Sequence, residues 1–260
     1  MVLNNLIIDL KNMGLNPTDT VLIHSSCKKI GYDANDILDT LMDYFKDVLL
    51  ILPSHTWATI NETNPIYNPL TSLPCLGILP TLFMKREKVY RSLHPTHSVL
   101  AYGNSSFEFI KGEEYNNTPA TPHGVYDRLR EKNAKILLIG VGNERNTFIH
   151  SVEEVLNIPN RLSDTPMHLC IKKDNILIDS YMRKHYNPKN PHISMDFPKL
   201  DKAFLTLKAM EEHSFGNAKV LVCDANKIFY ITRHILRKIQ KLLLMKNILM
   251  ILYGMIYYKI

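Results

Sequence analysis

The chain of 260 residues is long enough to bury one large hydrophobic core, and its 45% hydrophobic and 22% charged residues are typical of a globular domain. Its formal net charge of +6 suits an anionic ligand such as a nucleotide, but it is equally compatible with an ordinary basic surface. No run of Lys and Arg with interleaved aromatics indicates nucleic-acid binding, and the four scattered cysteines form no Cys-x-x-Cys motif for zinc or redox chemistry.

The N-terminal segment predicts a helix rather than a signal peptide. Apolar residues recur at helical spacing from Leu3 to Met13, and Gly14 supplies a C-terminal stop. The segment has neither the basic start nor the small-residue cleavage site of a secretory signal. Together with the absence of a cysteine framework, this predicts a cytoplasmic protein with reduced thiols.

Three apolar, β-rich runs alternate with helical patterns in the first 142 residues. The runs are 20–26, 48–55 and 134–142, and an amphipathic helix is predicted around 37–45. Such alternation is typical of a sheet that is covered by helices on both faces. We therefore predict a single α/β domain with a central mixed, mostly parallel sheet flanked by helices.

The remaining segments predict a functional loop and further elements. The polar, proline-containing stretch 54–75 is longer than most loops of a compact domain, and loops of this length are usually functional. The alternation over 167–182 predicts a β-hairpin. A helix is predicted over 197–213, followed by a strand over 218–224.

The C-terminal residues 242–260 form an apolar run that only Lys246 interrupts. The run is near the length of about 20 residues that a membrane span requires. We favour a buried or oligomer-interface helix over a membrane anchor, and a terminus foreign to the ancestral fold is a third alternative. The expected organisation is a domain over 1–240 and an atypical apolar C-terminal helix or extension over 241–260, in a monomer or homodimer.

A candidate general base follows the third predicted strand. The strand ends in Gly140–Gly142 and a helix begins near Thr147, at the sheet edge where open α/β folds bind ligands. His150 lies one turn into this helix, with Glu153 and Glu154 at spacings that share its face. A carboxylate raises the pKa of a neighbouring imidazole and fixes its tautomer, which suits a general base. The same pattern also fits an ordinary surface ion pair.

A weaker signal follows the first predicted strand. Ser25 and Ser26, with Gly31 shortly after them, could cradle an anionic group beside the next helix. No Gly-x-x-x-x-Gly-Lys motif is present, so a nucleoside triphosphate is not indicated.

The segment RSLHPTHSVLAYG at 91–103 contains two histidines around a proline. Pro95 biases His94 towards extended backbone, and His97 follows at a spacing that a strand does not bring to one face. No carboxylate accompanies the pair at metal-ligand spacing, so we expect no metal here.

Taken together, five blocks of the chain resemble the aminoglycoside 3-N-acetyltransferase (antibiotic N-acetyltransferase) family. They occur in the order and at the spacing of that family and cover about residues 1–235. The blocks are VLIHSSCKKIG (21–31), LILPSHTWA (50–58), RSLHPTHSVLAYG (91–103), LLIGVGNERNTFIHSVEE (137–154) and GNAKVLVCDA (216–225). The resemblance implies the dedicated α/β fold of this family, which is unrelated to the GNAT superfamily, with acetyl-CoA as donor and the 3-amino group of a 2-deoxystreptamine ring as acceptor.

The resemblance also implies roles for individual residues. The family motif Asn-Thr-x-x-His-x-x-Glu falls on His150 as the catalytic base and on Glu153 as its acidic partner. The residues that it implies on the acetyl-CoA side are Ser25, Ser26, Lys28, Arg91, His94 and Thr147. Those expected on the acceptor side are His55, Trp57, Glu62, Glu113 and Glu114. We expect the glutamates, with Glu144 and Asp196, to line an acidic cleft for the cationic acceptor. His97 is expected to be structural.

The chemistry that the resemblance implies is direct attack of the amine on the thioester while His150 takes a proton. Thr147 is a candidate to stabilise the oxyanion, and no cysteine pattern favours a covalent route. The chain departs from the family at 112–126, where Glu113 stands in place of a common histidine. Two alternatives remain: an acyltransferase of the same fold that acts on a non-aminoglycoside amine, and a binding module without activity.

Overall fold

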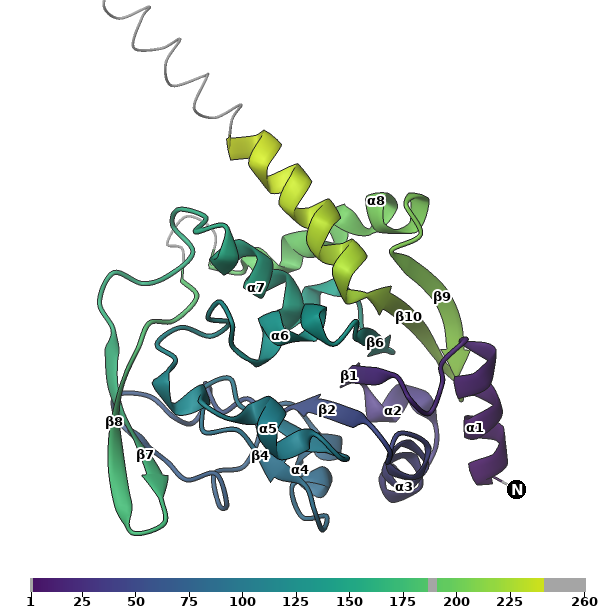
Figure 1. Ribbon diagram of the computed structural model, residues 1–260, viewed down its shortest axis with the longest axis horizontal. Coiled ribbons are helices and arrows are strands. Elements are labelled where there is room, and N and C mark those ends of the chain that lie inside the picture. Colours follow the sequence, from purple (N-terminus) through teal and green to yellow (C-terminus); the bar gives the residue numbers. More distant parts are fainter. Residues whose placement is uncertain (1, 187–190, 241–260) are drawn as a thin grey trace, which may run out of the picture.

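The computed structural model describes residues 2–186 and 191–240 (Figure 1). The extension predicted at 241–260 lies outside the described residues. In the two described stretches, no helix combines the length and the apolar character needed to cross a membrane.

A mixed seven-stranded sheet forms the centre of the molecule, in the order β4-β5-β2-β1-β6-β10-β9. Its strands are β1 Thr20–Ser25, β2 Leu49–Pro53, β4 Tyr90–Arg91, β5 Val99–Tyr102, β6 Lys135–Ile139, β9 Met210–Phe215 and β10 Ala218–Asp224. The predicted α/β fold and mixed sheet are confirmed. Parallel pairing is confined to β2, β1 and β6, however, whereas we expected most of the sheet to be parallel. The outer strands pair antiparallel because chain reversals, such as the tight turn between β9 and β10, return them beside their neighbours.

Side chains along the central strands alternate between two hydrophobic cores. On β1, Val21 and Ile23 enter one core and Leu22 enters the other. On β6, Leu137 joins the first core and Leu138 joins the second. Because both faces of these strands are buried, their sequences are continuous apolar runs rather than alternating ones.

Helices cover both faces of the sheet (Figure 1). The core of Val21 and Ile23 is closed by α1 Val2–Asn12, α2 Cys27–Ile30, α3 Ala34–Tyr44 and α4 Ile78–Phe83. The opposite core is closed by α5 Ser106–Ile110, α6 Val125–Glu131, α7 Thr147–Val155, α8 Asp201–Thr206 and the helical residues 225–240. Short 3-10 turns η1 Glu113–Tyr115, η2 Asn143–Arg145 and η3 Ile193–Leu200 complete the connections.

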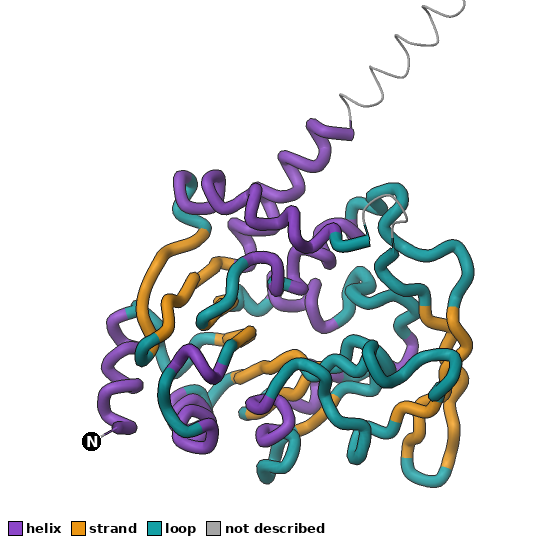
Figure 2. The backbone as a smooth tube through the Cα atoms, turned by 180° about the vertical axis from the view of Figure 1, so that it is seen from behind, coloured by secondary structure: helices purple, strands orange, loops and turns teal. Residues whose placement is uncertain are grey.

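A second, three-stranded sheet stands apart from the central one (Figure 2). It contains β3 Ile66–Tyr67, β7 Met167–Lys173 and β8 Ile176–Met182. The predicted hairpin over 167–182 is confirmed. The long loop over 54–75 contributes β3, which pairs parallel to β7 and links the loop to the hairpin. The inner face of this sheet has its own small apolar core.

The helix predicted over 197–213 is wrong in its second half. Helix α8 ends at Thr206, and residues 210–215 form strand β9. Lys208 adopts a positive φ of 50°, which ends the helix, and Met210 and Phe215 are then buried while the residues between them pair with β10. Antiparallel pairing with a distant strand overrides the local helical pattern.

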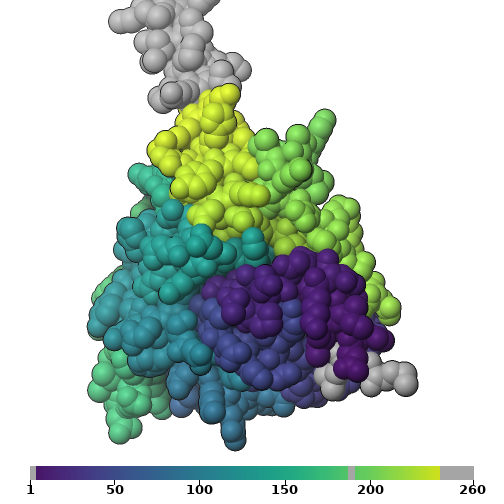
Figure 3. Space-filling view, turned by 45° about the vertical axis from the view of Figure 1, so that its right-hand side comes forward, coloured from purple at the N-terminus to yellow at the C-terminus, as the bar shows by residue number. Residues whose placement is uncertain are grey.

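The turn between β9 and β10 is fixed against the N-terminal part of the chain. The backbone N–H of Gly216 donates to the Asp9 carboxylate at 2.9 Å. Gly216 has a φ of 55°, and a Cβ there would lie 2.6 Å from the Ile30 carbonyl oxygen, so only glycine fits. The N-terminal residues accordingly lie against the segment that carries β9 (Figure 3).

Candidate active site

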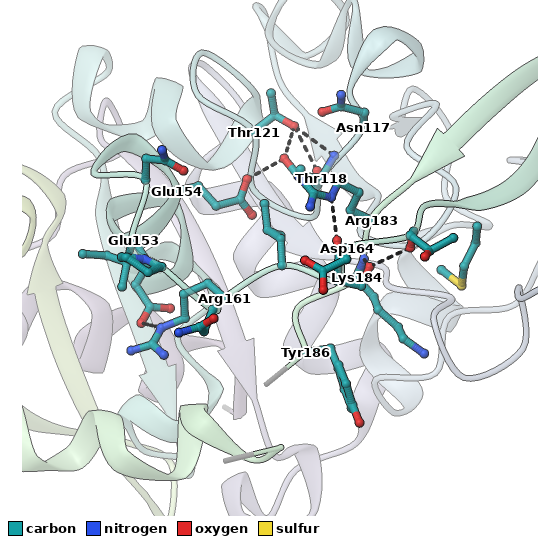
Figure 4. Close-up of a pocket in the computed structure, with 18 of the residues that line it drawn as sticks. Asn117, Thr118, Thr121, Glu153, Glu154, Arg161, Asp164, Arg183, Lys184 and Tyr186 are labelled. Atoms are coloured by element: carbon teal, nitrogen blue, oxygen red, sulfur yellow. Dashed lines mark hydrogen bonds and ion pairs between the residues drawn. The ribbon is translucent and has the colours of Figure 1, made fainter. Parts of the chain in front are cut away.

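Two neighbouring cavities lie in the molecule, and the larger one opens at the carboxyl ends of the central strands. The larger cavity has a volume of about 1120 Å³ and is lined from the end of β1, the segment after β2 and the start of α7. The smaller cavity, about 710 Å³, is lined mainly by the segments 117–122, 153–167 and 183–186 (Figure 4). Met167 and Lys184 line both cavities, so the two are neighbours. This edge of the sheet is where open α/β folds bind ligands.

The predicted pair of His150 and Glu153 lies between the two cavities. Helix α7 buries Phe148, Ile149 and Val152, which orients His150 towards the larger cavity and Glu153 towards the smaller one. His150 Nδ1 is 2.8 Å from Glu153 Oε2, and the side chains are 14% and 2% exposed. Glu153 is therefore buried and His150 is mostly covered, so the two do not form an ordinary surface ion pair.

Arg161 holds the carboxylate of Glu153 from the other side. Its Nε donates to Glu153 Oε1 at 2.6 Å (Figure 4). Burial would raise the pKa of Glu153, but the hydrogen bonds and charges of His150 and Arg161 outweigh it, and the pKa is below its ordinary value. Glu153 is thus a carboxylate that can only accept, so Nδ1 of His150 carries the proton.

The pKa of His150 moves in the direction opposite to the one we expected. Burial and the neighbouring His185 lower this pKa below 6.5, and the opposing effects of Glu153 and Glu154 do not compensate for them. The imidazole is therefore neutral at neutral pH, with its lone pair on Nε2. The described residues give Nε2 no hydrogen-bond partner, and His150 lines the larger cavity. This is the protonation state that a general base requires.

A second histidine–glutamate pair lies directly beside the first. His185 Nε2 is 2.6 Å from Glu154 Oε1, and the rings of His185 and His150 are 4.2 Å apart. Glu154 also accepts from the Thr118 hydroxyl and from the Ala120 backbone N–H. His185 was not predicted, because it lies 35 positions from His150 by their numbers, in a segment without a motif.

We expected His94 to lie at the acetyl-CoA site and His97 to be structural, and the structure places the two histidines the other way round. His94 is 1% exposed and lines neither cavity: its Nδ1 accepts from the backbone N–H groups of Thr96 and His97, and Nε2 is 3.0 Å from the Thr118 carbonyl. It therefore holds the loop in shape. His97 lines the larger cavity, with its ring 4.4 Å from that of His55.

Arg91, expected on the acetyl-CoA side, does not line either cavity. Its guanidinium is partly buried against the 54–75 loop, where it donates to the backbone carbonyls of Ser54, Pro69 and Ser72. It also lies over the ring of Tyr67. Arg91 belongs to β4, the strand at one edge of the central sheet, and its side chain points towards the loop. It therefore stabilises the long loop and does not bind at the cavity.

The acidic cleft that we expected around Glu113 and Glu114 is not formed by these residues. Glu113 is 1% exposed and accepts from the Val125 backbone N–H at 3.0 Å, at the start of α6. Burial raises its pKa to about 7. Glu114 pairs with Lys173 at 3.5 Å, away from both cavities. Of the three predicted acceptor-side glutamates, only Glu62 lines a cavity, and it lies on the smaller one.

The remaining predicted residues do line the larger cavity: Ser25, Ser26, Lys28, His55, Trp57 and Thr147. His55 Nε2 is 2.6 Å from the Tyr126 hydroxyl. Trp57 is 53% exposed, which makes it the accessible aromatic group of this cavity wall. His24, at the end of β1, was not predicted; it lines the cavity, and burial lowers its pKa to about 3. Within the described part of the chain, its Nε2 has no hydrogen-bond partner.

The walls of the larger cavity combine apolar and basic groups. Apolar groups come from Ile23, Leu52 and Leu79. Positive charge comes from Lys28, Arg145 and Lys184, against one negative charge from Glu144. Such a cavity suits an elongated ligand with an anionic end. The α/β fold thus places a neutral, carboxylate-anchored imidazole between two cavities, an arrangement typical of enzymes that use a histidine for proton transfer.

Comparison with known proteins places this chain in a family. The family model described as aminoglycoside 3-N-acetyltransferase matches residues 22–237. Aminoglycoside N(3)-acetyltransferase IV from Salmonella sp. is 27% identical over 218 residues, which cover 82% of this chain and 78% of the relative. The prophage-derived aminoglycoside N(3')-acetyltransferase-like protein YokD from Bacillus subtilis is 27% identical over 173 residues, covering 56% of this chain and 62% of the relative.

Solved structures share the fold. AAC-IIIb with CoASH superposes with a TM-score of 0.79 at 18% identity, covering 92% of this chain and 97% of the other. A variant of aminoglycoside acetyltransferase AAC(3)-IVa in complex with a gentamicin superposes with a TM-score of 0.77 at 23% identity, covering 90% and 88%. The chain belongs to the aminoglycoside 3-N-acetyltransferase family, and with it to the acyltransferases.

Proposed function

We propose that this enzyme transfers an acetyl group from acetyl-CoA to the 3-amino group of the 2-deoxystreptamine ring of aminoglycosides, and thereby confers resistance. The observation that carries the proposal is the His150–Glu153 pair between two cavities, with Nε2 of His150 facing the larger one. The names of the relatives support the acceptor class, as does the gentamicin complex of AAC(3)-IVa. The CoASH complex of AAC-IIIb supports the donor.

We assign the larger cavity to acetyl-CoA, because its residues fit such a ligand. When bound, acetyl-CoA supplies the thioester carbonyl that the amine attacks. Lys28 and Arg145 would meet its phosphates, and the hydroxyls of Ser25 and Ser26 can donate to them. Ile23, Leu52 and Leu79 offer apolar surface to its pantetheine arm.

We assign the smaller cavity to the polycationic acceptor. Its wall carries Glu62 and Asp164, both exposed, in addition to the paired Glu153 and Glu154. The basic side chains of Arg161, Arg183 and Lys184 lie on the same wall. Arg161 is paired with Glu153 and Arg183 donates to the Ser163 carbonyl, so Glu62 and Asp164 are the carboxylates that we expect to meet the ammonium groups. Carboxylates attract ammonium groups, and they do so more strongly in a cavity than in open water. A basic protein can bind a cationic drug here because the charge at the site, rather than the net charge, decides the binding.

In the proposed mechanism, the reacting amino group of the acceptor reaches from the smaller cavity into the larger one, where His150 removes the proton that the nitrogen must lose. As the N–C bond forms, Nε2 of His150 takes the proton, and Glu153 stabilises the resulting imidazolium through Nδ1–H. The C–S bond then breaks, and the proton on Nε2 can pass to the departing thiolate. Thr147, which lines the cavity at the start of α7, can donate to the developing oxyanion. No acyl-enzyme is required, because the two bound substrates are already adjacent.

The proposal extends to the surroundings of the site. Residues 1–240 would form the antibiotic N-acetyltransferase domain, in agreement with a family match that ends at residue 237. All four cysteines are free thiols, as expected in the reducing cytoplasm where acetyl-CoA is available. A monomer or homodimer remains our expectation.

A thiol-release assay with acetyl-CoA tests the proposal against a panel of deoxystreptamine aminoglycosides. Turnover with a member of the panel, and mass-spectrometric location of the acetyl group on the 3-amino nitrogen, is the expected result. Release that requires a different amine would favour the alternative acceptor, because a fold alone does not fix the substrate. No release with any amine would favour a binding module.

A further inference from the structure

The outer face of the β7–β8 hairpin places three side chains with metal-binding atoms together. Leu169 and Ile171 of β7 point into the small apolar core, so His168 and Cys170 lie on the opposite, outer face. In the antiparallel register, Asp179 of β8 is the direct partner of Cys170. The hairpin stands at the side of the molecule away from α1 (Figure 1).

The ligand atoms of these residues converge. His168 Nε2 is 2.8 Å from Asp179 Oδ1, and Cys170 Sγ is 3.9 Å from the same oxygen. All three atoms lie within 4.8 Å of one another, and no other three His, Cys, Asp or Glu side chains in the described part of the chain meet in this way. Tyr181 stacks on the His168 ring at 4.9 Å and thereby holds its orientation.

We propose that His168, Cys170 and Asp179 form a surface site for a divalent transition metal of the Zn²⁺ class. An imidazole nitrogen, a thiolate and a carboxylate are the ligands that Zn²⁺ takes, with water completing a tetrahedron. Bonds of about 2.0–2.3 Å set the ligand atoms about 3.4–3.6 Å apart in a tetrahedral site. The observed separations bracket these values, so small side-chain rotations would admit the ion.

The chemistry of the site also selects the kind of metal. A hard ion such as Mg²⁺ or Ca²⁺ prefers an all-oxygen shell, which a single carboxylate does not provide. Lys172 follows Cys170 on the same face of the strand. Its positive charge repels a metal ion, and this repulsion disfavours ions such as Mg²⁺ and Ca²⁺, whose binding is mainly electrostatic. A thiolate forms a largely covalent bond with a softer metal such as Zn²⁺, so binding of that metal is less weakened by the charge of Lys172. The site is separate from His150, and acetyl transfer does not require it.

Metal titration of the full-length, reduced and chelator-treated protein tests the site. Co²⁺, as the chloride, should produce thiolate-to-metal absorption that saturates at one ion per chain, and ZnCl₂ should bleach it. Cys170→Ser should abolish the absorption, and Asp179→Asn and His168→Gln should each weaken Co²⁺ binding at least tenfold. Cys75→Ser is the matched control, because this thiol lies in the segment before α4, and it should leave the absorption unchanged.

Thiol-release activity confirms that the variants of His168, Cys170 and Asp179 are folded, since none of these three residues lines either cavity. Circular dichroism checks the fold of Cys75→Ser, because Cys75 lines the larger cavity. Asp179 and His168 are exposed, so their variants provide folded alternatives if Cys170→Ser is damaged. Absence of absorption in the wild-type protein would overturn the proposal. So would absorption that persists in Cys170→Ser or disappears in Cys75→Ser.

Discussion

The two histidine–glutamate pairs of the site use opposite nitrogens of the imidazole. His150 contacts Glu153 through Nδ1, which leaves Nε2 on the cavity side, whereas His185 contacts Glu154 through Nε2. The anchors differ as well: Arg161 holds Glu153, and Thr118 and Ala120 hold Glu154. Each pair thus leaves a different nitrogen of its imidazole away from the carboxylate, and the mechanism that we propose uses Nε2 of His150.

We expect the largest loss of activity when the imidazole of His150 is removed from the His150–Glu153 pair. His150→Ala should lower kcat by about 10²–10⁴-fold, the usual contribution of a general base. Steady-state thiol release measures this loss, and circular dichroism checks the fold. His94→Gln is the control for loss of a histidine outside the cavities, and its kcat should fall much less, since His94 lines neither cavity. Full activity in His150→Ala would refute the mechanism.

A smaller loss, about 10²-fold in kcat, is expected for Glu153→Gln. Arg161 can only donate, so the amide oxygen of the glutamine would turn to Arg161 and its NH₂ group would face Nδ1. That arrangement favours the tautomer with the proton on Nε2, which cannot act as a base. Glu154→Gln is the matched substitution in the second pair, and it should cost less. A larger loss in Glu154→Gln than in Glu153→Gln would contradict the assignment of the pairs.

His185→Gln should change the pH dependence more than the maximal rate. His185 lowers the pKa of His150, so its removal should raise that pKa. A base must be neutral to act, and activity therefore rises as pH passes upward through the pKa of the base. The acidic limb of the kcat/KM profile should shift to higher pH, with little change at pH values well above the pKa. A shift to lower pH would show that His185 acts in another way.

The smallest effect on catalysis is expected for Glu113, which lies outside both cavities. Glu113→Gln should leave the acceptor KM unchanged, in contrast to Glu62→Gln or Asp164→Asn on the smaller cavity wall. An increase in acceptor KM on changing Glu113 alone would restore the acidic cleft that the sequence suggested.

The consequence of Glu113 for stability depends on pH. Its pKa is raised from 4.5 to about 7 in the folded protein, so folding favours the protonated form. That contribution is fully present below pH 4.5 and is lost as pH rises to about 7. The free energy of unfolding of the wild type should therefore fall by up to about 3 kcal/mol over this range relative to Glu113→Gln. Denaturant unfolding at the two ends of this range measures the difference, and equal pH dependence in both proteins would contradict it.

The parts of the fold and site that the sequence predicts are those set by local patterns. Strands β1, β2 and β6 are continuous apolar runs because both of their faces are buried. The contact between His150 and Glu153 follows from their spacing on one helix. Burial is not visible in that spacing, which is why the predicted direction of the pKa shift of His150 was wrong.

The parts that the sequence does not predict depend on distant segments. His185 reaches Glu154 only through the return of the chain after β8, and β9 is a strand only because β10 pairs with it. Arg91 and His94 sit in a family block, but their buried partners lie on other loops. The 91–103 block therefore indicated the region of the site. It did not show which of its side chains line the cavity, because that depends on contacts with other loops.

The tautomer of His150 decides whether it can act as the base, and nitrogen-resolved NMR of the imidazole side chains measures it directly. In ¹⁵N-labelled enzyme at neutral pH, with His150→Gln and His185→Gln providing assignments, we predict a proton on Nδ1 of His150 and none on Nε2. We also predict that Nε2 of His185 carries a proton. A signal showing Nε2 of His150 protonated at neutral pH would contradict the mechanism, because no lone pair would remain to accept the proton of the amine.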